Sequence, residues 1–405
     1  MRKILKRCLL LLLCMAALVC GVLGYLYSRL PGTFMVPQGQ TLTLAQMPWL
    51  TPLKPTGVAA AEAVPAGSSY NITLSVMGKV PLKTVRAVVV DRRAVTVCGS
   101  PFGIKMFSNG AMVVGFTDVS TQNGYANPAK AAGLKMGDII LSIGGKKTTN
   151  NKEVSAAIQD TGGKAAKLVY KRDGQEYTTT IQPVKTPESP DWHAGMWVRD
   201  SSAGIGTLTF VDNSTGVYGG LGHSISDSDT GQSIVLLSGE IAPVTITGYV
   251  PGAAGTPGEL KGRFISELAM GNILVNGPTG VYGRIRTVLE GQDMTIAQAQ
   301  EVHQGTAHIL TTISGTEPAL YEVELERLSL NEDDPNRNMV LHVTDKTLLE
   351  KTGGILQGMS GSPIIQDGRL VGAVTHVLVN DPTRGFGIFA ENMMETADTA
   401  AKKAA

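Results

Sequence analysis

The amino-acid sequence predicts a mainly β protein that begins with a membrane-spanning helix. Val, Ile and Thr are frequent among the 405 residues, only 5% are aromatic, and 48 glycines are available for turns. β-Branched residues favour strands, and glycines favour the turns between them. The 35 basic and 34 acidic residues nearly cancel, so the charge does not favour a nucleic-acid partner. This length predicts two or three domains.

The first 30 residues predict a cytoplasmic basic tail and a membrane anchor. Four basic residues lie within the first seven, and an uncharged run follows over 8–28. A helix of about 20 apolar residues spans a bilayer, and its basic flank stays in the cytoplasm, so the rest of the chain is expected outside. A cleaved signal peptide is the alternative, although the run is long for one and no Ala-x-Ala site follows it.

Cysteine usage limits the chemistry of the exported part. Three of the four cysteines lie in the apolar run, and Cys98 alone lies beyond it. A single cysteine forms neither an internal disulfide nor a cysteine-based metal site. The spacing of His303 and His308 does not fit metal ligands on a helix face. Because no glycine motif for a nucleotide lies in a strand–turn–helix context, we expect no metal and no cofactor.

Residues 31–98 are expected to hold a linker and a small β region. Residues 30–69 are rich in Pro, Gly, Ala and Gln and show no periodicity, which is typical of a linker. The runs 70–76, 80–90 and 94–97 are alternating or β-branched, so they predict strands.

Residues 99–185 predict a unit of short strands and two helices. A helix over 128–132 ends at Gly133, and a buried strand follows within 134–143. Asn150 then caps a second helix that has apolar residues on one face.

The segment 127–145 of this unit resembles the core of a PDZ domain. Such domains bind a peptide as an added strand, and a glycine-rich loop takes the terminal carboxylate. The resemblance implies that this loop is 100–105, with Phe102, Gly103 and Ile104 at the peptide, because its N–H groups can surround an anion. The alternative is a PDZ-like module that serves only for packing.

A boundary with two prolines at 186–191 separates this unit from a second β domain, which extends to residue 405. Many short strands separated by glycine turns favour a sandwich or a pair of barrels.

The hexapeptide Gly-Met-Ser-Gly-Ser-Pro at 358–363 suits a nucleophilic serine. Gly358 and Gly361 can take positive φ, which allows a sharp turn that exposes the Ser360 hydroxyl. Such a turn also gathers N–H donors for a developing oxyanion. Ser362 is a rival nucleophile, and a glycine turn without chemistry is the structural alternative.

His223 is the candidate general base, because small neighbours in Gly-His-Ser-Ile-Ser-Asp leave it accessible to a nucleophile. A hydrogen-bonded structural histidine is the alternative. Asp345 and Asp227 compete to orient this imidazole. We favour Asp345, because an acid four residues from the histidine more often bonds local backbone. Asp345 can also simply cap the helix that follows it.

The three candidates follow in the chain order histidine, aspartate, serine, which is that of chymotrypsin-like peptidases. The hexapeptide resembles the nucleophile signature of these enzymes, although Ser362 stands where they usually have glycine. The resemblance implies a double β-barrel with an oxyanion hole formed by the N–H groups of Gly358 and Ser360. It also implies a substrate-pairing strand at 369–376, on which His376 could line the cleft.

The order of anchor, PDZ module and peptidase motifs resembles the SpoIVB peptidase family, the stage IV sporulation protein B of endospore-forming bacteria. The motifs Gly-His-Ser-Ile-Ser-Asp, Gly-Met-Ser-Gly-Ser-Pro and Ala-Val-Thr-His carry the resemblance, which covers 70–405. It implies a secreted or membrane-tethered serine endopeptidase that acts between the forespore and mother-cell membranes. Members cleave a regulatory membrane protein, which activates intramembrane processing of the mother-cell sigma factor, and they also cleave themselves.

The predicted fold class is mainly β, with a transmembrane helix, a PDZ domain and a chymotrypsin-like double β-barrel. The expected parts are tail and anchor (1–30), linker and small β region (31–98), PDZ domain (99–185) and serine peptidase domain (186–405). Expected partners are the protein substrate, peptide C-termini and the membrane. The alternatives are a non-catalytic PDZ adaptor and an HtrA-like quality-control protease, although the latter places its PDZ domain after the protease.

Overall fold

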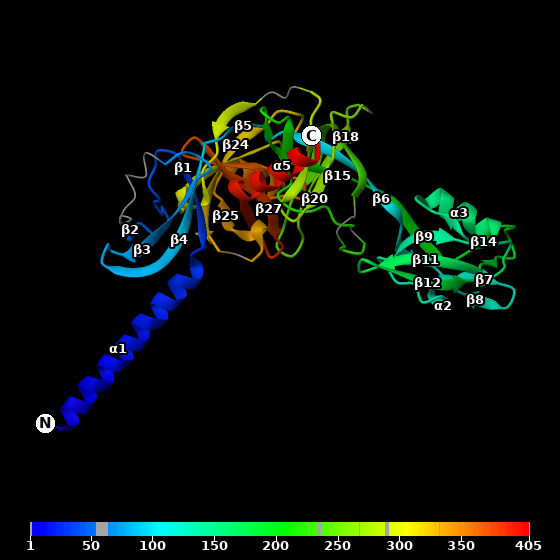
Figure 1. Cartoon of the computed structure of the whole chain (residues 1–405). Helices are drawn as coiled ribbons and strands as arrows, with labels where there is room; N and C mark the ends of the chain where they lie inside the picture. The colour runs from blue at the N-terminus through cyan, green and yellow to red at the C-terminus, as the bar shows by residue number, and fades with distance from the viewer. Residues whose placement is uncertain are drawn as a thin grey trace.

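The computed structural model describes residues 2–53, 64–227, 229–232, 236–266, 268–287, 291–331 and 333–404. The chain is mainly β, as the sequence predicts (Figure 1). The segment 54–63 of the expected linker lies outside the described residues.

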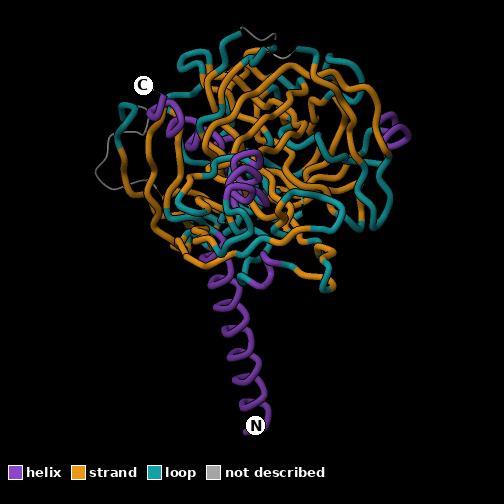
Figure 2. The backbone as a smooth tube through the Cα atoms, turned by 90° about the vertical axis from the view of Figure 1, so that its right-hand side faces the viewer, coloured by secondary structure: helices purple, strands orange, loops and turns teal. Residues whose placement is uncertain are grey.

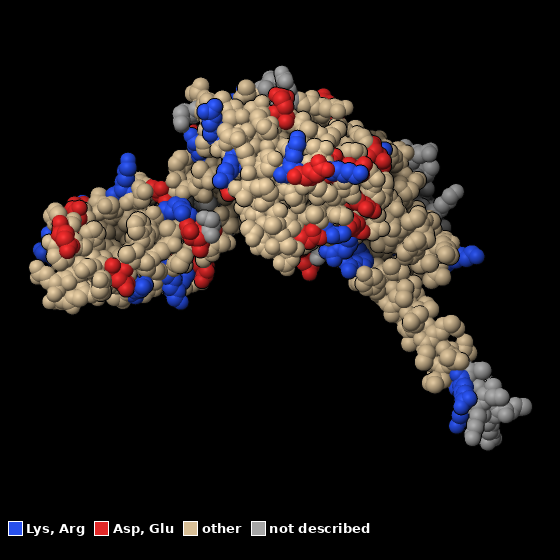
Figure 3. Space-filling view, turned by 180° about the vertical axis from the view of Figure 1, so that it is seen from behind, with Lys and Arg blue, Asp and Glu red and all other residues tan. Residues whose placement is uncertain are grey.

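Helix α1 (Arg2–Arg29) projects from the folded part of the chain (Figures 1 and 2). Its segment Leu9–Arg29 has 21 residues and contains an 18-residue window with a mean hydropathy of 2.6, none of which is buried in the protein. Figure 3 shows this helix as an uncharged surface with basic side chains near its far end. The helix is therefore long and apolar enough to cross a membrane, which agrees with an anchor or a signal sequence.

A small sheet follows the helix and has the strand order β1-β4-β3-β2. Its strands are β1 (Thr33–Pro37), β2 (Leu50–Leu53), β3 (Ser69–Val76) and β4 (Val80–Val90). The expected linker is therefore largely part of a folded unit. Alternate apolar residues explain this, since they fill the core of the sheet despite the prolines around them: Phe34, Val36, Leu42, Leu44 and Leu50.

The PDZ domain contains both helices that the sequence predicts. Helices α2 (Pro128–Ala131) and α3 (Asn151–Asp160) contribute to one core with β9 (Ile139–Ile143), β11 (Ala166–Arg172) and β12 (Gln175–Ile181). The side chains of two asparagines cap the helices, as expected for α3. The remaining short strands are β7 (Val119–Thr121), β8 (Gly124–Ala126), β10 (Lys146–Lys147), β13 (Val184–Lys185) and β14 (Trp192–His193).

Two long strands run from the PDZ domain into the second β domain. These strands, β6 (Pro101–Phe116) and β15 (Met196–Asp212), pair with each other along their length. The first half of β6 also pairs with β17 (Leu236–Val250). The expected domain boundary at residue 99 therefore falls just before a strand that both units share (Figure 1).

The first half of β6 and the second half of β15 belong to an open, barrel-like sheet. Its buried core includes Phe102, Met106, Leu208, Tyr218 and Ile241. The other strands of this part are β5 (Ala94–Val97), β16 (Val217–Gly220), β18 (Glu259–Phe264), β19 (Gly271–Asn272), β20 (Val275–Gly277), β21 (Gly280–Arg284) and β22 (Gln292–Thr295).

Six strands close a second barrel in the order β23-β24-β25-β28-β27-β26. Helix α5 (Ala390–Ala404) packs against both this barrel and the open sheet, and helix α4 (Lys346–Thr352) precedes the turn with the candidate nucleophile. The two barrel-like sheets agree with the predicted double-barrel class. The six strands are β23 (Gly305–Thr311), β24 (Ala319–Leu328), β25 (Met339–Val343), β26 (Pro363–Gln366), β27 (Arg369–Leu378) and β28 (Asp381–Phe389).

Candidate active site

Ser360 lies in a tight turn where the two barrels meet. Gly361 has φ +94°, and a Cβ there would lie 2.0 Å from the carbonyl oxygen of Thr207 on β15, so the turn requires glycine. The Thr207 N–H donates to the Ser360 carbonyl at 2.9 Å. The Ser360 hydroxyl donates to the carbonyl of Thr375 on β27 at 2.6 Å. The candidate nucleophile is thus held between one strand of each barrel.

Two N–H groups in this turn have no protein acceptor within the described ranges: those of Gly358 and Ser360. The neighbouring N–H groups of Met359 and Gly361 donate to the carbonyls of Leu356 and Val374. Gly358 and Ser360 both line a cleft between the barrels. The turn therefore leaves two backbone donors beside the Ser360 hydroxyl, as an oxyanion hole requires.

Ser362, the rival nucleophile, is fully buried. Its hydroxyl donates to the Met359 carbonyl at 2.6 Å and lies 2.8 Å from the Thr311 hydroxyl. A substrate cannot reach this oxygen in the present arrangement, which favours Ser360.

The cleft has a volume of about 560 Å³ and brings His223 and Ser360 into one site. It lies between the shared strand β15 and strand β27 of the closed barrel. Residues 374–378 of β27 pair with β28 on one side, whereas β26 pairs only with the earlier part of the strand. The lining includes Ile205, Leu221, His223, Gly358, Ser360 and His376.

The surroundings of the His223 imidazole favour a neutral ring. Its Nδ1 lies 2.8 Å from the Ser224 carbonyl oxygen. A carbonyl oxygen only accepts, so Nδ1 carries the proton and Nε2 keeps a free lone pair. Burial lowers the pKa of His223, and the bond to Ser224 opposes this in part. The ring is therefore neutral at pH 7, with its one proton on Nδ1.

His376 lies directly beside the candidate base. The two ring centroids are 4.5 Å apart, with an angle of 31° between the rings. Burial, followed by the nearby His223, lowers the pKa of His376 to about 4. Two neutral rings can share this space without charge repulsion. His376 therefore lines the cleft, as the sequence analysis expects.

The structure does not bring either candidate acid to His223. Asp345 is the N-cap of α4, and its side chain accepts from the Leu348 N–H at 2.9 Å. Asp227 is buried and lies 2.7 Å from the Arg199 guanidinium. Neither carboxylate lines the cleft. Asp345 thus lies where the helix-capping alternative places it. The carbonyl of Ser224, rather than a carboxylate, lies at Nδ1 of His223.

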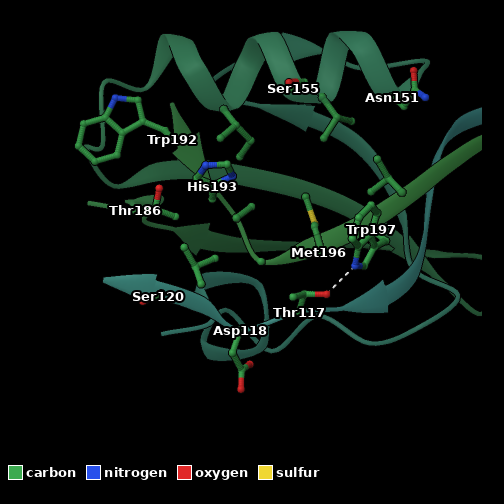
Figure 4. Close-up of a pocket in the computed structure, with 16 residues that line it drawn as sticks. Thr117, Asp118, Ser120, Asn151, Ser155, Thr186, Trp192, His193, Met196 and Trp197 are labelled. Carbon is green, nitrogen blue, oxygen red and sulfur yellow. Dashed lines mark hydrogen bonds between the residues drawn. The ribbon is translucent and has the colours of Figure 1, made fainter. Parts of the chain in front are cut away.

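The PDZ domain has a groove of about 400 Å³ between α3 and the start of β15 (Figure 4). Val154, Ser155 and Ile158 line it from the helix, and residues 196–198 line it from the strand. This part of β15 pairs with β6 on one side and with no described strand on the other. An extended peptide therefore has both a free strand edge and a helix face to contact.

The expected carboxylate loop is not at this groove. Phe102, Gly103 and Ile104 lie in the first half of β6, paired on one side with β15 and on the other with β17. Phe102 and Ile104 are buried, and a Cβ on Gly103 would lie 2.1 Å from the ring of Phe264. That prediction was wrong, because strands remote in the sequence occupy both edges of this segment. Residues 192–195, which lead into β15, line the groove instead.

Comparisons with known proteins agree with both domains. Residues 190–394, slightly more than half of the chain, match the family model described as SpoIVB peptidase S55. Residues 126–172 match the model of the PDZ domain.

Two curated relatives match shorter stretches. Serine protease HTRA1 of Xenopus tropicalis is 45% identical over 56 residues, which cover 14% of this chain and 12% of that protein. Zinc metalloprotease RasP of Shouchella clausii (strain KSM-K16) is 28% identical over 135 residues, 31% of each protein. The chain thus spans well under half the length of either relative.

Two solved structures are similar in part. The PDZ domain of the SdrC-like protein from Listeria monocytogenes has 21% identity and a TM-score of 0.18, covering 22% of this chain and 87% of that one. The HtrA-type protease AlgW with decapeptide has 11% identity and a TM-score of 0.30, covering 55% of this chain and 62% of that one.

Proposed function

The chain belongs to the SpoIVB peptidase S55 family, and on this premise we propose that it is a serine endopeptidase with Ser360 as its nucleophile. One observation carries the proposal: the Ser360 hydroxyl, two N–H groups without a protein acceptor and a neutral imidazole line the same cleft. Acyl transfer requires these three groups together.

In the proposed reaction, Ser360 leaves the Thr375 carbonyl and attacks the carbonyl carbon of a peptide bond. Nε2 of His223 takes the hydroxyl proton, and the N–H groups of Gly358 and Ser360 donate to the new oxyanion. His223 then gives the proton to the leaving amine, which breaks the C–N bond and leaves an acyl-enzyme. Water attacks the ester with His223 as base and regenerates the serine.

The acid of the expected triad enters this mechanism as a positioning residue. Asp345 caps α4, which ends at Gly353, and the chain then leads directly to the turn at 358–361. Loss of the cap would therefore act on the nucleophile through the helix. The Ser224 carbonyl, 2.8 Å from Nδ1, fixes the tautomer of His223 without an added charge.

We extend the proposal to an extended protein substrate that pairs with β27. Beyond Val374, no described strand pairs with the edge of β27 opposite β28, and this edge borders the cleft. Family membership supports a role in sporulation, in which cleavage of a regulatory membrane protein activates intramembrane processing of a sigma factor, and supports self-cleavage. Helix α1 supports a site on the outer face of a membrane. Family membership supports the space between forespore and mother cell as the location.

The PDZ groove is proposed to select this substrate by binding a protein C-terminus. The free edge of β15 supplies backbone groups to an added strand, and α3 supplies an apolar wall. The approach to β15 at 192–195 replaces 100–105 as the proposed carboxylate site.

The test is peptide hydrolysis by the full chain in detergent with Ser360→Ala. The rate should fall by about 10⁴-fold or more, since the nucleophile is lost. Ser362→Ala is the matched control: it should keep most of the rate, at a cost of about 1 kcal/mol in stability from a lost buried hydrogen bond. Unchanged hydrolysis by Ser360→Ala would overturn Ser360 as the nucleophile, whereas no hydrolysis by the unsubstituted chain would favour the non-catalytic PDZ adaptor.

A further inference from the structure

The turn between β3 and β4 presents an exposed apolar tip. Met77 is 75% exposed, Val80 is 49% exposed, and Trp49 from the loop before β2 is 37% exposed. The Met77 N–H donates to the Trp49 carbonyl at 2.8 Å, and the Lys79 N–H donates to the Val76 carbonyl at 3.0 Å. We call Trp49, Met77, Lys79 and Val80 the hairpin tip. Its apolar side chains are held together by backbone bonds and face solvent.

The hairpin tip leads into β4, the strand that holds the end of α1. The Lys83 ammonium on β4 donates to the Leu30 carbonyl at 2.5 Å and to the Tyr27 carbonyl at 3.2 Å. It also lies 4.6 Å from the centroid of the Tyr27 ring. Lys83 lies three positions after Val80, about 10 Å along a strand. In Figure 1 the hairpin turns at the lower left of the molecule, on the side from which α1 descends.

The charge around the tip suits an anionic surface. The described residues between 30 and 90 include three basic side chains, Lys79, Lys83 and Arg86, and no acidic one. Lys79 lies within the tip, and Lys83 and Arg86 follow on β4. Tryptophan prefers the membrane–water interface, and lysine extends its ammonium from apolar surroundings to lipid phosphates. The tip thus combines apolar, aromatic and basic side chains in the way of an interfacial anchor.

We propose that the hairpin tip enters the interfacial layer of the bilayer that α1 crosses. Trp49, Met77 and Val80 lie among the upper acyl chains, and Lys79 lies at the headgroup phosphates. The proposal rests on α1 as a membrane span and does not depend on peptidase activity. A lipid surface is the occupant that these observations favour, because covalent continuity with α1 keeps the tip beside a bilayer. The result is a second contact that fixes the orientation of the small sheet on the membrane.

Tryptophan quenching tests this placement in the full chain. The protein contains three tryptophans, so Trp192→Phe with Trp197→Phe leaves Trp49 as the single probe. The experiment uses the Ser360→Ala background, in which self-cleavage by the proposed site is removed, and vesicles of phosphatidylcholine and phosphatidylglycerol. Bromine atoms near the glycerol end of the acyl chains should quench Trp49 strongly, whereas aqueous iodide should quench it weakly. Strong iodide quenching without bromine quenching overturns the proposal.

Substitutions in the tip provide the second arm. Met77→Asp with Val80→Asp should at least halve bromine quenching of Trp49 and raise iodide quenching. Leu268→Asp is the matched control, since Leu268 is 80% exposed in the peptidase domain and should leave both signals unchanged. Far-ultraviolet circular dichroism checks the fold of each variant. Iodide quenching of Trp49 could instead weaken as the protein concentration rises at constant lipid. This result would assign the tip to a contact with a second copy of the chain and contradict the proposal.

Discussion

At the scale of single residues, the candidate site depends on how one imidazole is oriented. A carbonyl at Nδ1 fixes the tautomer of His223, and burial keeps the ring neutral. A carboxylate at Nδ1 would instead raise the pKa by stabilising the imidazolium. The carbonyl and carboxylate arrangements therefore predict opposite shifts of the His223 pKa.

The pH dependence of catalysis distinguishes them. A general base acts in its neutral form, so activity is present above its pKa and is lost as the pH falls through it. Because burial lowers the pKa of His223 from its ordinary value of 6.5, the acid limb of kcat/KM should lie below pH 6.5. The measurement is kcat/KM of the full chain on a peptide across this range. An acid limb above 6.5 would point to a carboxylate beside the ring.

Asp345 is tested by two substitutions that separate capping from catalysis. Asparagine is as good an N-cap as aspartate, whereas alanine costs about 1 kcal/mol. Asp345→Asn should therefore keep kcat within a few-fold and leave the melting temperature nearly unchanged, and Asp345→Ala should lower the melting temperature. A fall in kcat of about 10⁴-fold in Asp345→Asn alone would match a triad acid and contradict the capping role.

At the scale of elements, local sequence signals predicted the helices and turns correctly. Asn150 caps α3, and the helix buries Val154, Ala157 and Ile158 on one face, as its spacing predicts. The segment 100–105 was misassigned because its structure depends on partners far away in the sequence. Strands β15 and β17 pair with its two edges. Both strands are remote in sequence, so the residues near 100–105 do not reveal this pairing.

The groove beside α3 is tested by filling it. Ser155 lines the groove and has an exposed side chain, so Ser155→Trp should block peptide binding at low cost to the fold. Cleavage of a protein substrate should fall at least ten-fold, while hydrolysis of a short peptide stays within two-fold.

Lys152→Trp is the control, because Lys152 is exposed on the same helix and does not line the groove. Equal loss of protein cleavage in both variants would argue against substrate selection at this groove.

At the scale of the whole molecule, composition and motif order predicted the β-rich class, the PDZ domain and the barrel-like sheets. The arrangement of the PDZ domain on two strands shared with the peptidase domain was not predictable. Short motifs mark a turn or a cap, but the length of a shared strand depends on tertiary pairing. We propose that the peptidase domain begins near β5 and that the PDZ domain is an insertion between β6 and β15.

The same limit applies to the candidate site. Ser360, Gly358 and His223 were predicted from small residues around reactive groups, and all three line one cleft. Asp345 was favoured over Asp227 because an acid four residues from the histidine more often bonds local backbone, and this argument contains no distance from Asp345 to the ring. In the structure, Asp345 is the N-cap of α4, and the Ser224 carbonyl lies at Nδ1 of His223. Sequence reasoning considered only acidic side chains for this place, so it did not consider a backbone carbonyl.

The most direct test of the central claim is labelling of the full chain with a serine-directed fluorophosphonate, followed by mass spectrometry of the adduct. The account predicts one adduct, on Ser360, that forms at least 10³-fold more slowly in His223→Ala, because the serine then lacks its base. An adduct on Ser362, or labelling of Ser360 at an unchanged rate without His223, would contradict it.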